Sequence, residues 1–434
     1  MRQQDVIFSS KHPTAIYLLA ATEMCQRFAY WGVYYLLVLF LVNYFKYTIP
    51  DATSFFAIYT GLAAALHLLG GYIADKWNDR SPIFLGMLLT TLGCFLFLPL
   101  KAKLLIPALG CIGLGGGLFN PTAYSLLGRL YTKHYHIREG GFSIYYVIVN
   151  LGSFFGLIVL GYLQTIHWRY AFFLAGCAPL IGLIPYRYAL RRLKKISRHH
   201  HHFISKEQDP HTFPLKRHER DRIFVILMMT FISIFFWIAY NQAGSSITLF
   251  ALNYTHRDIG SFRIPVPWFT ALYILFLAIL AFPLANFYLF LRRIKSSASP
   301  PMRTALSLFF LGLCFIVMQR AAAPIPIGSL QGSAPFYYLV LAFALMALAE
   351  LFLTPIIFSL VTNLSPHRYR GVLTGCWFAC MGIGLYIGGS LTKLMTVIRL
   401  ASFFDIFIFT SFIPAFLILL FSKKLDAMRH IDSL

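Results

Sequence analysis

Long apolar runs separated by short polar connections occupy nearly all of the 434 residues. Twelve of these runs approach or exceed the roughly 20 residues that a membrane-spanning helix needs. Their apolar positions are continuous rather than alternating, which predicts helices and argues against the strands of a membrane barrel. The predicted spans are residues 14–44, 53–75, 82–100, 104–129, 141–164, 168–190, 222–251, 268–291, 303–322, 335–364, 371–397 and 400–423.

The composition excludes the main alternatives to a membrane protein. Apolar residues make up 58% of the chain and charged residues 12%, about half of the roughly 25% that is usual in soluble proteins. A disordered chain has few aromatic residues, whereas 17% of this chain is aromatic. We therefore predict an all-α membrane protein with twelve transmembrane helices.

One segment interrupts the apolar pattern, and it divides the spans into six and six. Residues 191–221 are basic, rich in histidine and poor in apolar residues. This predicts an N-terminal six-helix bundle at 1–190, a cytoplasmic basic linker at 191–221 and a C-terminal six-helix bundle at 222–434. The four histidines His199 to His202 could bind a metal. A solvated linker near anionic headgroups is the preferred interpretation, so we predict no metal site.

The net charge is +22. In a membrane protein, the basic residues indicate the orientation of the chain in the membrane, so we expect no nucleic-acid partner. With the N-terminus in the cytoplasm, 27 of the 37 Lys and Arg residues fall on the cytoplasmic side and nine on the outer side. The positive-inside rule then predicts a multi-pass protein of the cell (inner or plasma) membrane with both termini in the cytoplasm. The N-terminus has no cleavage site for a removable signal peptide.

Charged residues at bilayer depth are costly, and the first span contains two of them. Glu23 and Arg27 are four residues apart, so one helix face can hold them as an ion pair. Tyr30 and Tyr34 extend that face into a polar stripe, which should face protein or water rather than lipid. The pair could serve only to fix helix packing, because its charges cancel.

Glu350 in the tenth span has no basic residue within two helical turns along the sequence. Pro355 follows it and can kink or break the helix. A carboxyl group at this depth is typical of a ligand or proton site, and a protonated Glu bonded to a neighbouring helix is the alternative.

Two further patterns concern helix ends and helix packing. Gly71, Asp75 and Arg80 lie at the cytoplasmic end of the second span, where a glycine permits close approach and the charges can lock a loop. The glycine-rich runs 113–117 and 382–389 lie within spans and predict tight helix contacts rather than a phosphate site. No catalytic motif is present, so we predict a protein that is not an enzyme and has no cofactor.

Several ordered motifs resemble the proton-dependent oligopeptide transporters of the major facilitator superfamily. The first span, EMCQRFAYWG, is similar to the family's E-x-x-E-R-F-x-Y-Y-G. The other matching segments are GGYIADKW (70–77), GFSIYYVIVNLGS (141–153), HWRYAFFLAG (167–176), NQAGSSITLFA (241–251), IPVPWF (264–269), AELFLTPIIFSLVTNLSP (349–366) and GCWF (375–378).

The resemblance implies alternating access, with a central substrate site between two rocking bundles and a proton gradient as the driving force. It places the substrate's amino terminus at Glu350, with Asn150 nearby and Trp377 as an aromatic wall. Glu23 and Arg27 would belong to the proton-coupling network, together with Glu350. The expected substrate-binding set also contains Tyr30, Tyr34, Asn241 and Tyr273.

This sequence departs from the family pattern by losing two acidic and two basic residues, so the net charge of these positions does not change. Gln26 and Asn241 stand where the family has acids, and Tyr34 and Leu118 where it has bases. Losing both partners of an ion pair can be nearly neutral, so the fold should survive. Tyr273 also replaces an asparagine and Ala64 a tyrosine.

We therefore expect a monomeric, proton-coupled transporter of di- and tripeptides or peptide-like amines in the lipid bilayer. The retained groups, Glu23, Arg27 and Glu350, have a net charge of −1, which favours an amine over a carboxylate. The alternatives are a non-transporting membrane sensor or scaffold with this fold, and an uncoupled facilitator of a small amine.

Overall fold

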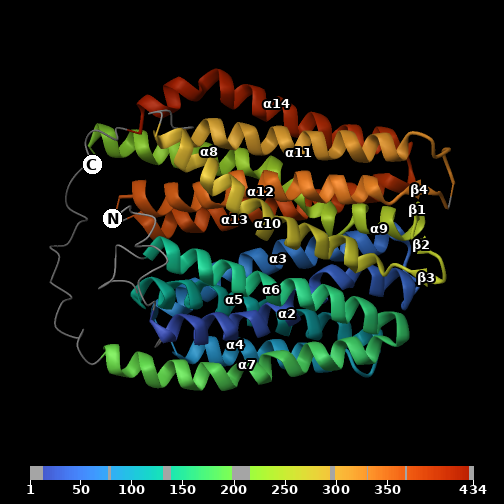
Figure 1. The fold of residues 1–434 in the computed structure, drawn as a ribbon, viewed down its shortest axis with the longest axis horizontal. Coiled ribbons are helices and arrows are strands. Elements are labelled where there is room, and N and C mark those ends of the chain that lie inside the picture. Colours follow the sequence, from blue (N-terminus) through green and yellow to red (C-terminus); the bar gives the residue numbers. More distant parts are fainter. Residues whose placement is uncertain are drawn as a thin grey trace. The chain divides into compact units, whose positions relative to one another are not determined.

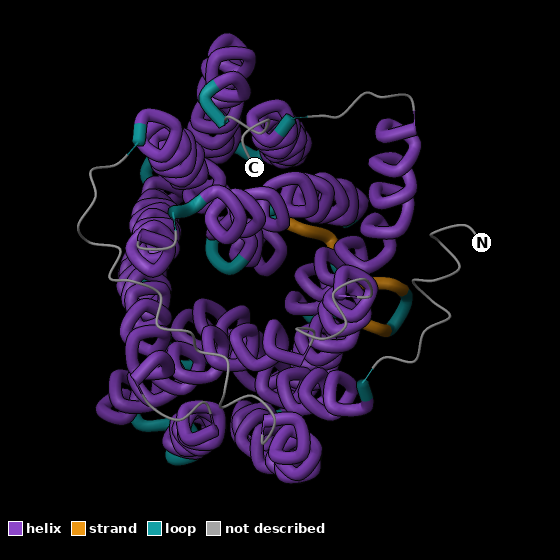
Figure 2. The backbone as a smooth tube through the Cα atoms, turned by 90° about the vertical axis from the view of Figure 1, so that its left-hand side faces the viewer, coloured by secondary structure: helices purple, strands orange, loops and turns teal. Residues whose placement is uncertain are grey.

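The computed structural model describes residues 13–76, 80–130, 138–197, 216–293, 299–329, 331–366 and 369–429. Figure 2 shows that helices form nearly all of the regular structure and that strands are confined to short connections. Within these ranges, 11 helices are long and apolar enough to cross a membrane, and the segment Ser81–Leu96 forms a shorter apolar helix. The predicted all-α fold is confirmed.

The helices follow the predicted spans closely, and most boundaries differ by a few residues (Figure 1). The first six are α2 (Thr14–Asn43), α3 (Ile49–Lys76), α4 (Arg80–Leu96), α5 (Leu105–Leu130), α6 (Arg138–Ile166) and α7 (Trp168–Ser197). The later ones are α8 (Arg217–Tyr240), α9 (Ser246–Asn253), α10 (Val266–Arg293), α11 (Pro300–Ala322), α12 (Tyr337–Leu364), α13 (Arg370–Leu391) and α14 (Leu400–Ala427).

The chain divides into two compact units, which are described separately. Unit 1 comprises Met1–Leu37 and Leu62–Gln208, and unit 2 comprises Val38–Gly61 and Asp209–Leu434. The contacts thus group the end of α2 and the start of α3 with the later helices. The division into bundles at 1–190 and 222–434 stays a prediction. Of its linker, 191–197 belong to α7 and 217–221 to α8, whereas His199 to His202 lie outside the described residues.

In unit 1, α4 packs against α5 and α7, and α6 packs against α7. Large side chains fill the core between these helices, among them Phe119, Tyr145 and Tyr186. Helices α3 and α5 approach so closely that a Cβ atom on Gly70 would overlap the carbonyl group of Gly117. The expectation that the glycines at 113–117 serve helix packing is confirmed.

In unit 2, α8 lies against α11, α12, α13 and α14. The predicted span at 222–251 is confirmed as part of one apolar span, Arg217–Asn253. It is not one continuous α-helix, because α8 ends at Tyr240 and α9 begins at Ser246. A short 3-10 turn, η4 (Asn241–Ala243), joins them. The hydrophobic run is unbroken on both sides, so hydropathy alone misses this interruption, whereas the polar sequence NQAGSS marks it.

The remaining regular structure is short and belongs to unit 2 apart from one turn. Strand β1 (Thr255–His256) pairs in parallel with β4 (Ala334–Pro335), and β2 (Asp258–Ile259) pairs antiparallel with β3 (Phe262–Arg263). Two further 3-10 turns are η1 (Ala102–Leu104) in unit 1 and η6 (Thr392–Thr396) in unit 2. These short elements lie in the connections between helices, and the helices position the polar side chains of the candidate site.

Candidate functional site

The first predicted polar stripe contains an ion pair inside unit 1. Arg27 Nε donates to Glu23 Oε1 at 2.8 Å, across one turn of α2. The Glu23 side chain is fully buried, and that of Arg27 is 15% exposed. The ion pair predicted from the four-residue spacing is therefore confirmed.

Helix α6 completes the hydrogen bonding of this pair. The Tyr145 hydroxyl donates to the second carboxylate oxygen of Glu23, and Arg27 Nη1 donates to Asn150 Oδ1 at 3.2 Å. Asn150 Nδ2 in turn donates to the Tyr146 carbonyl at 2.9 Å. Both charged groups are thus held from α2 and α6 together, and Tyr145 is a member of the network that the sequence alone did not indicate.

Aromatic rings continue the same face of α2. Tyr30 and Tyr34 are both buried, with 5% and 4% of their surface exposed. The ring of Trp31 contacts each of them edge to face, at centroid distances of 5.4 and 5.1 Å. Tyr30 also meets the ring of His67 in α3. The predicted stripe is therefore buried, and its Tyr30 faces α3 within unit 1.

Neutral polar groups from α3, α4 and α5 lie in the same unit. His67 Nδ1 lies 2.7 Å from the Ala63 carbonyl, which can only accept, and His67 Nε2 lies 2.9 Å from Asn120 Nδ2. This arrangement corresponds to a neutral imidazole with its proton on Nδ1. Gln26 Nε2 donates to Thr90 Oγ1 at 2.7 Å, so the amide that replaces an acid is also bonded.

In unit 2, polar side chains at the interruption between α8 and α9 form hydrogen bonds to a neighbouring helix. Asn241 Nδ2 donates to the Leu385 carbonyl of α13 at 2.5 Å. Gln242 Nε2 donates to the Gly388 carbonyl at 2.8 Å, and its Oε1 accepts from Ser246 and Thr392. This buried cluster attaches the break to α13, and the predicted site residue Asn241 is part of it.

Tyr273 and Trp377 are buried near aromatic neighbours. The Tyr273 hydroxyl lies 3.4 Å from that of Tyr240, the last residue of α8. Trp377 of α13 is 7% exposed, and its ring lies 4.9 Å from that of Phe378. The structure therefore brings Tyr273 next to the residue that precedes Asn241.

Glu350 lies in α12 and is half-buried. Helix α12 contacts α8, α10, α11 and α13, so it is a central helix of unit 2. It runs without interruption from Tyr337 to Leu364, so Pro355 does not break it. A carboxyl group on such a helix can bind a cation or a proton, which is the role predicted for Glu350.

The predicted gating residues are located only by backbone. Gly71 and Asp75 lie in the last turns of α3, and Arg80 begins α4. Their side chains lie outside the described part of the structure. Their role stays a prediction.

The network around Glu23 joins two helices through charged and polar side chains. Because Arg27 donates to Asn150 and Tyr145 donates to Glu23, both charged groups of α2 are bonded to α6.

Comparison with known proteins identifies the family. Residues 19–319 match the Major Facilitator Superfamily. The chain belongs to this superfamily. It is also 27% identical over 450 residues to the peptide transporter YePEPT of Yersinia enterocolitica, covering 87% of each chain.

Solved structures of peptide transporters have the same fold as this chain. A crystal structure of the peptide transporter POT in complex with sulfate is similar with a TM-score of 0.85, at 22% identity and 99% coverage of both chains. The tetrameric PepTSo2 is similar with a TM-score of 0.71, at 19% identity, covering 95% of this chain and 97% of that one. The resemblance to oligopeptide transporters is confirmed, as is the membrane-transporter fold.

Proposed function

We propose that the protein is a secondary active transporter that takes up di- and tripeptides, or peptide-like amines, together with protons. Membership of the superfamily supports transport by alternating access. The similarity to a curated peptide transporter over 87% of the chain supports peptides as the substrate class. The names of the relatives describe transporters rather than enzymes. We therefore propose transport without a catalytic reaction.

The buried network of Glu23, Arg27, Tyr145 and Asn150 is the observation that best supports proton coupling. A fully buried carboxyl group can change its charge only together with its surroundings, because an unpaired charge there is costly. In the proposed cycle, protonation of Glu23 weakens its bond to Arg27 and loosens the contact between α2 and α6. Proton binding would thus be linked to helix movement within unit 1.

Substrate recognition is proposed to depend on an amine rather than a carboxylate. Glu350 is the proposed partner of the amine, and Tyr30, Tyr34, Asn150, Asn241, Tyr273 and Trp377 complete the proposed binding set. Two positions where the family has bases are Tyr34 and Leu118, so little positive charge is left for a carboxylate. An N-acetylated dipeptide should therefore compete poorly, whereas a C-terminally amidated dipeptide should compete as well as the free form.

A flux assay in proteoliposomes tests the proposal. We expect an inwardly directed proton gradient to drive a labelled dipeptide above its external concentration, and Glu350→Gln to abolish this accumulation. Glu219→Gln is the matched control, because Glu219 lies at the start of α8 and accepts from the Lys216 amide, a bond that Gln can also make.

Each other outcome identifies an alternative. Binding without flux would indicate a sensor, and equilibration without accumulation would indicate an uncoupled facilitator. If Glu219→Gln lost as much accumulation as Glu350→Gln, the loss would not be specific to Glu350 and the proposed role of Glu350 would be wrong.

Topology and assembly are proposed on sequence grounds. The protein is a multi-pass membrane protein, and the charge distribution supports an inner-membrane location with both termini in the cytoplasm. Gly71, Asp75 and Arg80 are proposed to gate the cytoplasmic end of unit 1. A monomer is proposed, and light scattering of the purified protein would distinguish it from a tetramer such as PepTSo2.

A further inference from the structure

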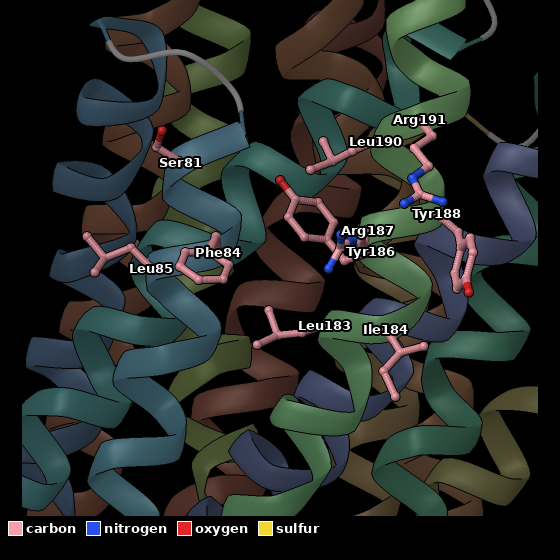
Figure 3. Close-up of a pocket in the computed structure, with 10 residues that line it drawn as sticks. All are labelled: Ser81, Phe84, Leu85, Leu183, Ile184, Tyr186, Arg187, Tyr188, Leu190 and Arg191. Atoms are coloured by element: carbon pink, nitrogen blue, oxygen red, sulfur yellow. The ribbon is translucent and has the colours of Figure 1, made fainter.

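An open groove lies between the start of α4 and the end of α7 in unit 1. Its volume is about 940 Å³, and Figure 3 shows the side chains that line it. The two helices pack directly against each other and lie side by side in Figure 1. None of the lining residues belongs to the proposed transport site.

The walls of the groove are apolar and accessible. Phe84 and Leu85 contribute from α4, and Leu183 and Ile184 from α7 (Figure 3). Phe84 is 48% exposed and Ile184 is 60% exposed. In a helix that spans a bilayer, such a surface faces hydrocarbon, so acyl chains can lie along it.

The groove contains two basic side chains. Among the residues that the structure describes, the charged side chains that line it are Arg187 and Arg191. They are four residues apart on α7, so both side chains leave the same face of the helix. Among the described residues, no ion pair with either arginine is found.

One of these arginines lies over an aromatic ring. The guanidinium carbon of Arg191 lies 5.6 Å from the ring centre of Tyr188. Stacking on a ring leaves the in-plane N–H groups of a guanidinium available. These N–H groups form two parallel hydrogen bonds to a phosphate or a carboxylate.

The position of the groove along α7 indicates which kind of anion can reach it. It lies at the end of α7 that leads into the basic segment 191–221, which the charge distribution places at the cytoplasmic surface. The cytoplasmic leaflet contains anionic phospholipids, and each Lys or Arg near it adds to the attraction. A free phosphate ion would use the arginines but not the four apolar side chains.

We propose that this groove binds an anionic glycerophospholipid, with Arg187 and Arg191 at the phosphate and Phe84, Leu85, Leu183 and Ile184 along the acyl chains. The bound lipid fills the surface between α4 and α7 and stabilises their contact. The site is independent of the proposed substrate, since it requires only that unit 1 lies in a membrane.

The test is a lipid titration of the full chain purified in detergent, with the melting temperature as the measurement. We expect dioleoyl phosphatidylglycerol to raise the melting temperature at a lower concentration than dioleoyl phosphatidylcholine. In the variant R187Q/R191Q, the concentration of phosphatidylglycerol needed for half of the shift should rise roughly 10- to 30-fold. The variant R187K/R191K should lose less, because it keeps both charges.

The matched control is R217Q/R220Q, which removes two exposed arginines at the start of α8 and the same net charge. It should keep the preference of the wild type. Equal responses to the two lipids, or an equal loss in the control, would overturn the proposal. Protection by inorganic phosphate or glycerol phosphate in the same concentration range would show a site for free phosphate and would overturn it as well.

Discussion

Glu23→Gln and Arg27→Met, made singly and together, test whether the buried pair is a coupled unit. The single substitutions each leave one charge without its opposite partner, whereas the double variant leaves none. Gln and Met are close in size to the residues they replace, so the changes act mainly through charge and hydrogen bonding.

The structure sets the expected magnitude. Removing one partner of a buried ion pair costs roughly 3–5 kcal/mol. Here the lower end applies, because Arg27 keeps its 3.2 Å bond to Asn150 and is 15% exposed, and Glu23 keeps its bond from Tyr145. We expect each single variant to lose about 3 kcal/mol of unfolding free energy, and the double variant to lose no more than about 2 kcal/mol.

The assay is equilibrium unfolding of the four proteins in mixed micelles, followed by helical circular dichroism. Independent sites would give a double variant that loses about as much as both single variants together, roughly 6 kcal/mol. That result would refute the coupling. Proton-driven uptake separates structure from function, because the stable double variant should still lack it. Recovery of uptake in the double variant would show that the pair only fixes helix packing.

Two further predictions concern helix contacts. Gly70→Ala should lower the melting temperature of the purified protein strongly, because its new Cβ would overlap the Gly117 carbonyl. Gly110→Ala is the control and should have little effect, since a Cβ atom there would meet nothing within 4 Å. Equal effects of the two substitutions would contradict the close approach of α3 and α5. Gln242→Ala should cost about 2–3 kcal/mol in the same unfolding assay, since it removes a donor to the Gly388 carbonyl and the acceptor of the buried Ser246 and Thr392 hydroxyls. An effect below about 0.5 kcal/mol would mean that these bonds do not hold the helix break.

Local sequence was sufficient for the helices and for contacts within one helix. A span is recognised from about 20 consecutive apolar residues because the bilayer core fixes its length. The ion pair between Glu23 and Arg27 followed from helical spacing alone, since residues four apart lie on one face. The glycines at 113–117 were likewise assigned to packing because they lie within a span.

The break at Asn241 to Ser245 was missed because hydropathy averages over a window that is apolar on both sides. The polar residues there are not exposed, as a turn would suggest, but bonded to α13 through Leu385 and Gly388. Whether a polar run in a span ends the helix depends on whether a neighbouring helix supplies acceptors for it.

The partners of the charged pair needed tertiary structure. Tyr145 is separated from Glu23 by 122 residues, and Asn150 from Arg27 by 123. No periodicity along the chain relates such positions, because the contact depends on how α2 and α6 pack. The sequence by itself determined which segments form apolar helices and which of these contain charges, since both follow from the cost of polar groups in hydrocarbon. Only the folded chain decided what each buried charge touches, because side chains from distant helices must satisfy it.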